Sequence, residues 1–241
     1  MKTALITGAS GAIGRAAAHR LHRDGYRVIL NYHTARDAAE ALARELNASG
    51  TGEQALPVRA DVSRREDVLA LFRAAGDVDV LVNNAGISRQ TLFTDISPEE
   101  WRRVFAVNVD GVFYCCQCAL PHMIHEKHGK IINISSMWGQ TGASCETHYS
   151  ASKAAVIGLT KALAKELGPS NIQVNCICPG VIRTPMNASF SPETMTELAE
   201  ETPLGRIGEP EEIADAIGFL ASSEADFITG QILGVNGGFV I

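Results

Sequence analysis

The chain has 241 residues, of which 46% are hydrophobic, and its formal net charge is −6. That length suffices for one well-buried core, so we expect a single domain over residues 1–241. The acidic balance argues against a nucleic-acid partner, because phosphate binding depends on clustered Lys and Arg. Since neither a signal-peptide pattern nor an apolar run of about 18 residues stands out, we also expect a cytoplasmic protein with no membrane partner.

Apolar segments of strand length alternate with helical patterns along the chain. Continuous apolar strands separated by helices are typical of a parallel sheet covered on both faces. The pattern therefore predicts an α/β fold, a Rossmann-like doubly wound sheet of seven parallel strands with helices on both faces. The expected strands are residues 4–7, 28–31, 55–59, 80–83, 131–135, 174–178 and 232–235.

Helix starts are predicted where a hydroxyl residue precedes an acid by three positions, because the two side chains can cap the first turn. The three pairs are Thr34 with Asp37, Ser63 with Glu66, and Ser97 with Glu100. All three fall between expected strands, in agreement with the alternation.

A glycine-rich turn follows the first expected strand and opens a helix. It reads Thr-Gly-Ala-Ser-Gly-Ala-Ile-Gly over residues 7–14. Backbone amides and the positive helix end would face a pyrophosphate there, so the turn predicts dinucleotide binding. A turn without a ligand is the alternative, because glycine-rich runs are often turns only.

The six cysteines are not arranged as the paired Cys-x-x-Cys motifs of a zinc ribbon, so we expect reduced thiols. Cys118 and His122 lie four residues apart on an expected helix and could form half of a metal site. No second pair completes four ligands, and we expect no metal.

Ser136, Tyr149 and Lys153 form the most informative group. Residues four apart share a helix face, so the Lys153 ammonium should lie beside the Tyr149 hydroxyl and lower its pKa below the usual value of about 10. Tyr149 could then protonate a ketone oxygen as hydride arrives, while Ser136 holds that oxygen. The group predicts carbonyl reduction, or its reverse.

The segment 184–208 is longer than an ordinary connection between helices and strands. It contains Pro185, Pro192, Pro203, Gly205 and Gly208 around a short helical pattern. We expect it to be a lid over the substrate.

Taken together, several motifs resemble the short-chain dehydrogenase/reductase family, over nearly the whole chain from Thr7 to Gly238. They are the glycine-rich turn, the catalytic group, Asn83-Asn84-Ala85-Gly86, Asn108, and Pro179-Gly180 followed by Thr184. The resemblance implies that Asn108 kinks its helix and holds a water that links Lys153 to solvent, and that Lys153 also binds the nicotinamide ribose. A catalytically inactive member of the same fold, which senses cofactor or binds a regulatory partner, is the alternative.

The resemblance also implies the cofactor contacts. The family has glycine where this chain has Ala12, and a positive φ there would strain the alanine. NADPH is expected over NADH, because the second strand ends without the acid that NAD-preferring members carry. The expected cofactor-binding residues are Gly8, Ser10, Gly11, Ala12, Ile13, Gly14, Asn31, Tyr32, His33, Asp61, Val62, Asn84, Ala85, Gly86, Tyr149, Lys153, Pro179, Gly180, Ile182 and Thr184.

The 2′-phosphate of NADPH needs a cation. Arg36, Arg15 or His33 could supply it, although each of these side chains could instead be a solvated surface group.

Two substrate classes are suggested by further resemblance. Residues 203–210 and 228–238 look like those of 3-oxoacyl-acyl-carrier-protein reductases. Such enzymes dock an acidic carrier protein on two basic residues, and the corresponding positions here are Lys127, which is charged, and Ser170, which is not. The loop 138–149 resembles elongation factor P 5-aminopentanone reductases, which act on a ketone bearing a free amine.

Glu146 separates these two hypotheses. A carboxylate three residues before Tyr149 would attract an ammonium group and repel a phosphopantetheine arm. Glu146 could instead face solvent or cap a helix, and Trp138 could be packing rather than a substrate wall. His148 is expected to be a surface histidine, because helix neighbours point apart.

The family commonly forms dimers or tetramers through the helix that begins near Ala151. Small residues Ala151, Ala154, Ala155 and Gly158 would let another backbone approach, or would pack on the protein's own sheet. We expect a homo-oligomer.

Overall fold

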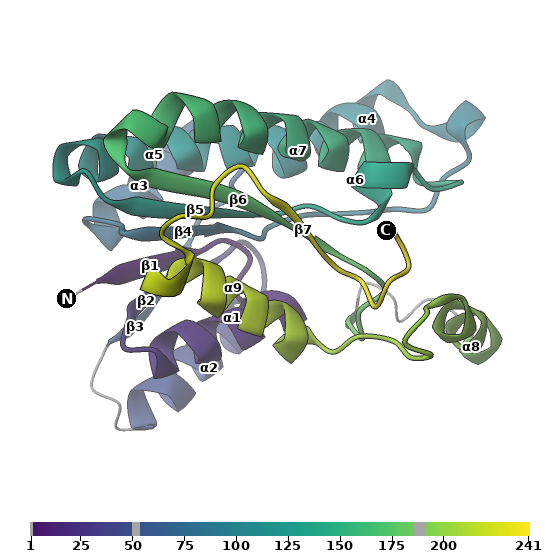
Figure 1. The fold of residues 1–241 in the computed structure, drawn as a ribbon, viewed down its shortest axis with the longest axis horizontal. Helices are drawn as coiled ribbons and strands as arrows, with labels where there is room; N and C mark the ends of the chain where they lie inside the picture. Colours follow the sequence, from purple (N-terminus) through teal and green to yellow (C-terminus); the bar gives the residue numbers. More distant parts are fainter. Residues whose placement is uncertain (1, 50–53, 186–190) are drawn as a thin grey trace.

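The computed structural model describes residues 2–49, 54–185 and 191–241. Seven strands form one parallel sheet in the order β3-β2-β1-β4-β5-β6-β7, with helices on both faces (Figure 1). The strands are β1 (Thr3–Ile6), β2 (Arg27–Tyr32), β3 (Ala55–Arg59), β4 (Val80–Asn83), β5 (Gly129–Ile134), β6 (Ile172–Pro179) and β7 (Ile232–Val235). The predicted doubly wound sheet is confirmed, and every strand lies within two residues of its expected bounds.

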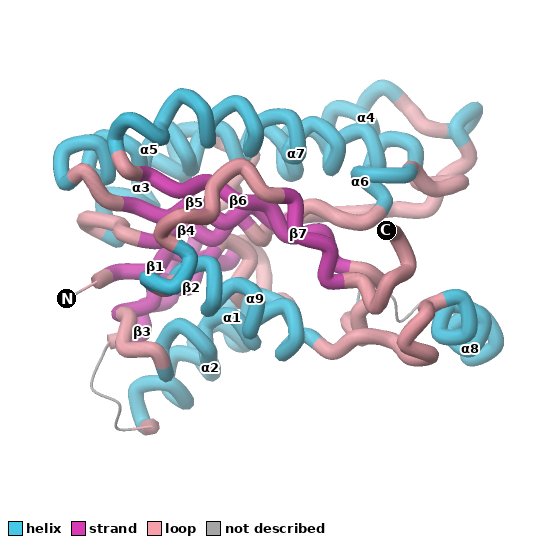
Figure 2. The backbone as a smooth tube through the Cα atoms, viewed as in Figure 1, coloured by secondary structure: helices cyan, strands magenta, loops and turns pink. Residues whose placement is uncertain are grey.

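Helices cover the sheet in two layers, which Figure 2 shows in cyan above and below the magenta strands. Helices α1, α2 and α9 cover one face, and α3, α5 and α7 cover the other. The helices are α1 (Ala12–Arg23), α2 (Arg36–Ala48), α3 (Arg65–Ala75), α4 (Pro98–Phe105), α5 (Gly111–Glu126), α6 (Trp138–Thr141), α7 (Thr147–Leu167), α8 (Pro192–Glu201) and α9 (Pro210–Ala221).

Strand β1 shows why the strands are continuously apolar. Ala4 and Ile6 pack into the core beneath α1 and α9, whereas Leu5 packs into the core beneath α3 and α5. All three residues are 0% exposed. Successive side chains of a strand point to opposite faces, so a sheet covered on both faces needs apolar residues at every position.

Only one of the three predicted helix caps is formed. The Ser97 hydroxyl accepts a hydrogen bond from the Glu100 backbone N–H at 3.1 Å. The predictions at Thr34 and Ser63 are wrong, because α2 and α3 begin later and have no side-chain cap. The Ser63 hydroxyl donates instead to Asp61, at 2.6 Å.

The stretch Pro98–Glu126 is a continuous helix made of α4, a π-helical turn at Ala106–Asp110 and α5. By length and composition alone it could cross a membrane, although the sequence shows no uninterrupted apolar run of that length. In this fold, Cys115, Ala119 and Met123 of α5 are buried in the core against the sheet. Burial under the doubly wound sheet explains their apolar character.

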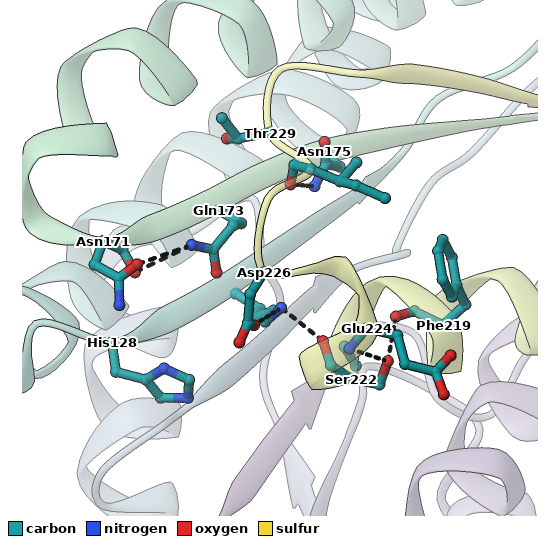
Figure 3. A network of polar contacts seen from close by, with 12 residues as sticks. His128, Asn171, Gln173, Asn175, Phe219, Ser222, Glu224, Asp226 and Thr229 are labelled. Carbon is teal, nitrogen blue, oxygen red and sulfur yellow. Dashed lines mark hydrogen bonds and ion pairs between the residues drawn. The ribbon is translucent and has the colours of Figure 1, made fainter.

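The sheet edge formed by the amino ends of β5 and β6 is held by polar contacts (Figure 3). Lys130, the second residue of β5, has a side chain only 3% exposed, and its Nζ donates to Asp226 Oδ1 and to the Ser222 carbonyl, each at 2.7 Å. Asn175 of β6 donates to the Ile228 carbonyl at 2.7 Å. These contacts fix the segment after α9 at the edge opposite the carboxyl ends of the strands.

Cys118 and His122 lie on α5, as expected. The His122 ring faces two carboxylates, with Nδ1 3.5 Å from Asp77 and Nε2 3.6 Å from Asp79. Among residues 2–49, 54–185 and 191–241, no group of three or more His, Cys, Asp or Glu side chains is arranged to hold a metal ion. The six cysteines are free thiols.

Candidate active site

A cavity of about 1060 Å³ lies along the carboxyl ends of the parallel strands. Its place agrees with the usual ligand position in such sheets, where the strand order reverses, here between β1 and β4. Of the predicted site residues, Tyr32 and Asn108 do not line it. Those that do are Gly8, Ser10, Gly11, Ala12, Ile13, Gly14, Asn31, His33, Asp61, Val62, Asn84, Ala85, Gly86, Ser136, Trp138, Glu146, Tyr149, Lys153, Pro179, Gly180, Ile182 and Thr184.

The glycine-rich turn forms one end of the cavity. Gly8 has φ of +64°, which favours glycine, and its N–H donates to Asn31 Oδ1 at 3.2 Å. A Cβ on Gly14 would overlap the Gly8 carbonyl oxygen and lie 2.8 Å from the Ala9 Cα, so only glycine fits there. Helix α1 begins within this segment, at Ala12, and its first residues line the cavity, a geometry that fits a diphosphate.

Ala12 causes no backbone strain in this turn. It is the first residue of α1 and is not among the residues with positive φ. Strain at Ala12 is expected only if its φ is positive. Since Ala12 is the first residue of a helix, a position that suits alanine well, it does not strain the loop.

Asn84 joins the ends of β1 and β4 behind the turn. Its side-chain amide donates to the carbonyls of Thr7 at 2.9 Å and Gly8 at 3.1 Å. The Thr7 hydroxyl accepts from the N–H groups of Asn84 and Ala85 at 2.9 and 3.0 Å. Asn83, by contrast, points into the core and donates to Asn133 at 2.9 Å.

The end of the cavity beyond β2 carries His33, Asp61 and Arg103. His33 Nε2 and Arg103 Nη1 each lie 3.6 Å from Asp61 Oδ2. Burial opposes ionisation of Asp61, but its hydrogen bonds with Ser63 and the nearby cations hold its pKa below the ordinary value. A negatively charged Asp61 therefore lies between the His33 ring and the Arg103 guanidinium at this end.

Sequence reasoning did not name Arg103 and offered Arg15 and Arg36, together with His33, as candidates. Arg15 and Arg36 do not line the cavity and pair with carboxylates of their own, Glu45 at 2.5 Å and Glu40 at 2.6 Å. The signal for Arg103 was its spacing, because it lies one helical turn before the cavity residue Val107 on the same continuous helix.

Tyr149, Lys153 and Ser136 meet at the middle of the cavity. Lys153 Nζ lies 5.6 Å from the centre of the Tyr149 ring and donates to the Ile134 carbonyl at 2.9 Å. Burial lowers the pKa of Lys153 to about 8. Ser136 hydrogen-bonds the Tyr149 hydroxyl.

The predicted lowering of the Tyr149 pKa is wrong in this structure. Burial raises the pKa of Tyr149 to about 12, against the opposite effect of the hydrogen bond with Ser136. The lysine fails to reverse this because its ammonium lies against the ring and bonds the Ile134 carbonyl. Tyr149 therefore keeps its proton at neutral pH.

Asn108 lies in the π-helical turn and is fully buried. Its Oδ1 accepts from the Ile87 N–H at 2.9 Å, and its Nδ2 donates to the Ile87 carbonyl and to Ser152 Oγ, both at 3.0 Å. A Cβ on Gly86 would lie 3.2 Å from Lys153 Nζ and 3.5 Å from Asn108 Oδ1. Glycine at 86 thus leaves the space between Lys153 and Asn108 free of a side chain.

Trp138 and Glu146, the two residues predicted to contact the substrate, both line the cavity. Trp138 also packs edge-on against Phe239, with ring centres 5.6 Å apart. Glu146 accepts a hydrogen bond from Ser88 Oγ at 3.0 Å and makes no side-chain cap to α7. Burial raises the pKa of Glu146.

His148 is 0% exposed, so the expectation of a surface histidine is wrong. It faces α4, which packs on the first turns of α7. The sequence carries no local sign of that helix contact.

The fold and the site together define an α/β oxidoreductase with a dinucleotide-sized cavity. A family model described as enoyl-(acyl carrier protein) reductase matches residues 8–240. The chain belongs to the short-chain dehydrogenase/reductase family, and the resemblance seen in its motifs is confirmed.

Two curated relatives cover nearly the whole chain. The 3-oxoacyl-(acyl-carrier-protein) reductase FabG of Staphylococcus aureus is 42% identical, over 98% of this chain and 97% of its own length. The uncharacterized oxidoreductase YmfI of Bacillus subtilis is 43% identical, over 99% and 98%. Among solved structures, the 3-oxoacyl-(acyl-carrier-protein) reductase of Brucella melitensis is 38% identical with a TM-score of 0.94, covering 100% of this chain and 92% of that one.

Proposed function

We propose that this protein reduces a ketone to a secondary alcohol with NADPH, and that Tyr149 donates the proton. The observation that carries the proposal is the meeting of Tyr149, Ser136 and Lys153 in a cavity whose other end is a glycine-rich diphosphate cradle. The chemistry that a bound nicotinamide supplies is hydride donation. An inactive, cofactor-sensing protein would have no need for all three polar groups at this position.

The proton chemistry follows from the surroundings of Tyr149. Because its pKa is raised to about 12, Tyr149 carries its proton at neutral pH and can donate to an oxygen that gains negative charge. The Ser136 hydroxyl hydrogen-bonds the Tyr149 hydroxyl and would hold the ketone oxygen next to that proton donor. Lys153 is protonated below a pKa of about 8 and would stabilise the tyrosinate left after transfer once its ammonium turned from the Ile134 carbonyl to the Tyr149 oxygen.

Arg103 and His33, which lie beyond β2, support NADPH over NADH. The carboxyl end of β2 carries no acid, and Asp61 is engaged with Ser63, His33 and Arg103. A 2′-phosphate bound near His33 and Arg103 would be attracted to both. Calorimetric titration with 2′,5′-ADP and 5′-AMP tests this, and equal affinity for the two would contradict it.

A 3-oxoacyl thioester is the first candidate substrate, because relatives named 3-oxoacyl-(acyl-carrier-protein) reductase align over the full chain. Lys127 and Ser170 precede β5 and β6, so they lie at the sheet edge opposite the cavity. A carrier docked on them is therefore not adjacent to the cavity of the same chain.

An amino ketone, such as the 5-aminopentanone group on elongation factor P, is the second candidate, and Glu146 favours it. The Glu146 carboxylate lines the cavity, where Ser88 is its single hydrogen-bond donor among the described residues. It also raises the pKa of Tyr149, which places its charge close to the proton donor. A substrate ammonium would stabilise this carboxylate, because burial raises the pKa of Glu146 and only Ser88 and His148 oppose that rise.

The test compares NADPH oxidation with an acetoacetyl thioester and with a small amino ketone, using wild type and Glu146→Gln. If the substrate is cationic, Glu146→Gln should raise the KM for the amino ketone about tenfold and leave the KM for a neutral ketone unchanged. Equal effects on both ketones would remove the amino-ketone candidate. No oxidation with either ketone would contradict the proposed function as a whole.

We also propose that helix α8 is part of a lid over the substrate and that the protein is a homo-oligomer. Thr194 and Leu198 of α8 line the cavity, while residues 186–190 of the expected lid lie outside the described part of the chain. On α7, a Cβ at Gly158 would meet nothing within 4 Å, which supports contact with another subunit rather than with the protein's own sheet. Light scattering after size-exclusion chromatography tests assembly.

A further inference from the structure

The substrate side of the molecule contains a buried histidine that the proposed reaction does not use. His148 precedes Tyr149 in the first turn of α7 and is 0% exposed. Within the described part of the chain, neither ring nitrogen has a hydrogen-bond partner. Its Nε2 lies 3.4 Å from Glu100 Oε1 on α4. Buried polar groups are rarely left without partners, so the pair requires a physical explanation.

Glu100 connects α4 to the loop that lines the cavity. Its side chain is 18% exposed, and the oxygen that faces His148 also accepts a hydrogen bond from Thr91 Oγ1 at 2.9 Å. Arg89 Nε lies 3.9 Å from the same oxygen. A proton on Nε2 would point to this carboxylate, whereas an unprotonated Nε2 would face it with a lone pair. One carboxylate oxygen thus faces both α7 and the loop.

The same loop is joined to the segment before α7 at two further points. The Thr91 N–H donates to the Cys145 carbonyl at 2.8 Å, and Ser88 Oγ donates to Glu146 at 3.0 Å. Cys145 has φ of +61°, a left-handed conformation that costs a non-glycine residue about 1 kcal/mol or more. Such a conformation persists only where surrounding contacts hold it.

We infer that His148 and Glu100 form a latch that positions the substrate wall, meaning residues 88–91 and 145–147 of this chain. Neither residue lines the cavity, whereas Ser88, Arg89 and Glu146 do. His148 and Glu100 are therefore positioning residues. They act through Thr91 and Cys145 to hold the Glu146 carboxylate beside the proton donor. Only the kinetic consequence of the latch rests on the proposed function.

Hydrogen exchange read by mass spectrometry tests the latch without any activity. In Glu100→Gln and in His148→Asn, the amides of residues 88–91 should exchange at least about tenfold faster than in wild type. The matched control is Glu99→Gln, because Glu99 is 77% exposed and contacts Arg102 of its own helix. Unchanged exchange at residues 88–91 in both variants would overturn the inference.

Kinetics provide the second readout. Each variant should raise KM for the ketone about tenfold, with kcat and dinucleotide affinity within about twofold of wild type. Because both residues act through one contact, Glu100→Gln combined with His148→Asn should raise KM no further than either change alone. A double variant whose effect is the product of the single effects would show that the residues act independently, against the latch.

Thr91→Val provides an independent test if Glu100→Gln or His148→Asn fails to fold. It removes the hydroxyl that bonds Glu100 and leaves the buried pair untouched. Faster exchange at residues 88–91 supports the latch, and wild-type exchange contradicts it. If the wild-type protein reduced no ketone, the proposed function would fail while the exchange comparison still decided the latch.

Discussion

The two ends of the cavity are built in different ways. At the cofactor end, backbone conformation sets the geometry: Gly8 has positive φ, Gly14 leaves no room for a Cβ, and Asn84 bonds main-chain carbonyls. At the substrate end, side-chain pairs set it, such as Ser88 with Glu146. Backbone geometry belongs to the fold, whereas side-chain pairs change with single substitutions. The fold itself therefore maintains the geometry of the cofactor end of the cavity. The shape and charge of the substrate end can change with single substitutions.

Tyr149→Phe should have the largest effect, and it should change catalysis without changing dinucleotide binding at the other end of the cavity. Loss of the proton donor should lower kcat by about 10²- to 10⁴-fold, because no other donor replaces the hydroxyl. Dinucleotide affinity should stay near that of wild type, since the phosphates would bind at the distant glycine turn. Steady-state rates with calorimetric titration measure both, and retention of more than a tenth of wild-type kcat would contradict the assignment.

Gly14→Ala attacks the cofactor end instead. The new methyl would overlap the Gly8 carbonyl oxygen and displace the turn. We expect dinucleotide affinity to fall at least about tenfold and the free energy of unfolding to fall by about 1 to 3 kcal/mol. Calorimetry and urea unfolding measure these. Gly168→Ala is the control, because a Cβ there would meet nothing within 4 Å.

Lys153→Met should lower activity but raise stability at neutral pH. The pKa of Lys153 is about 8 when folded, below its usual value, so the folded state holds a charged amine at a cost below pH 8. Between pH 8 and about 10.5 the unfolded state binds more protons, so wild-type stability from this group rises with pH.

The variant should therefore be more stable than wild type by about 1 to 2 kcal/mol at pH 7, after the cost of leaving the Ile134 carbonyl unpaired. That advantage should shrink as pH rises to about 10. Urea unfolding at the two pH values measures the difference, and a less stable variant at pH 7 would show that the cost of the buried amine is small.

Ala12→Gly should have the smallest effect. Since Ala12 is already helical and unstrained, glycine relieves nothing there, and dinucleotide affinity should remain within about twofold of wild type. A large gain in affinity in the same titration would show that the alanine methyl obstructs the phosphates.

The sequence predicted those features that depend on local pattern. The strands followed from apolar runs, and the glycine turn, Ser136, Tyr149 and Lys153 were found from spacing. Features set by tertiary contact were missed. The exposure of His148 depends on α4, the pKa of Tyr149 depends on total burial, and the Ser63 cap was lost to a competing bond with Asp61.

The position of β1 inside the sheet, between β2 and β4, has a consequence for folding during synthesis. β1 pairs with β2 on one side and with β4 on the other. β4 spans Val80–Asn83, so one edge of β1 has no partner until about a third of the chain has left the ribosome. An unpaired apolar strand is a template for aggregation. The nascent chain should therefore need protection most while the segment between β2 and β4 is being translated.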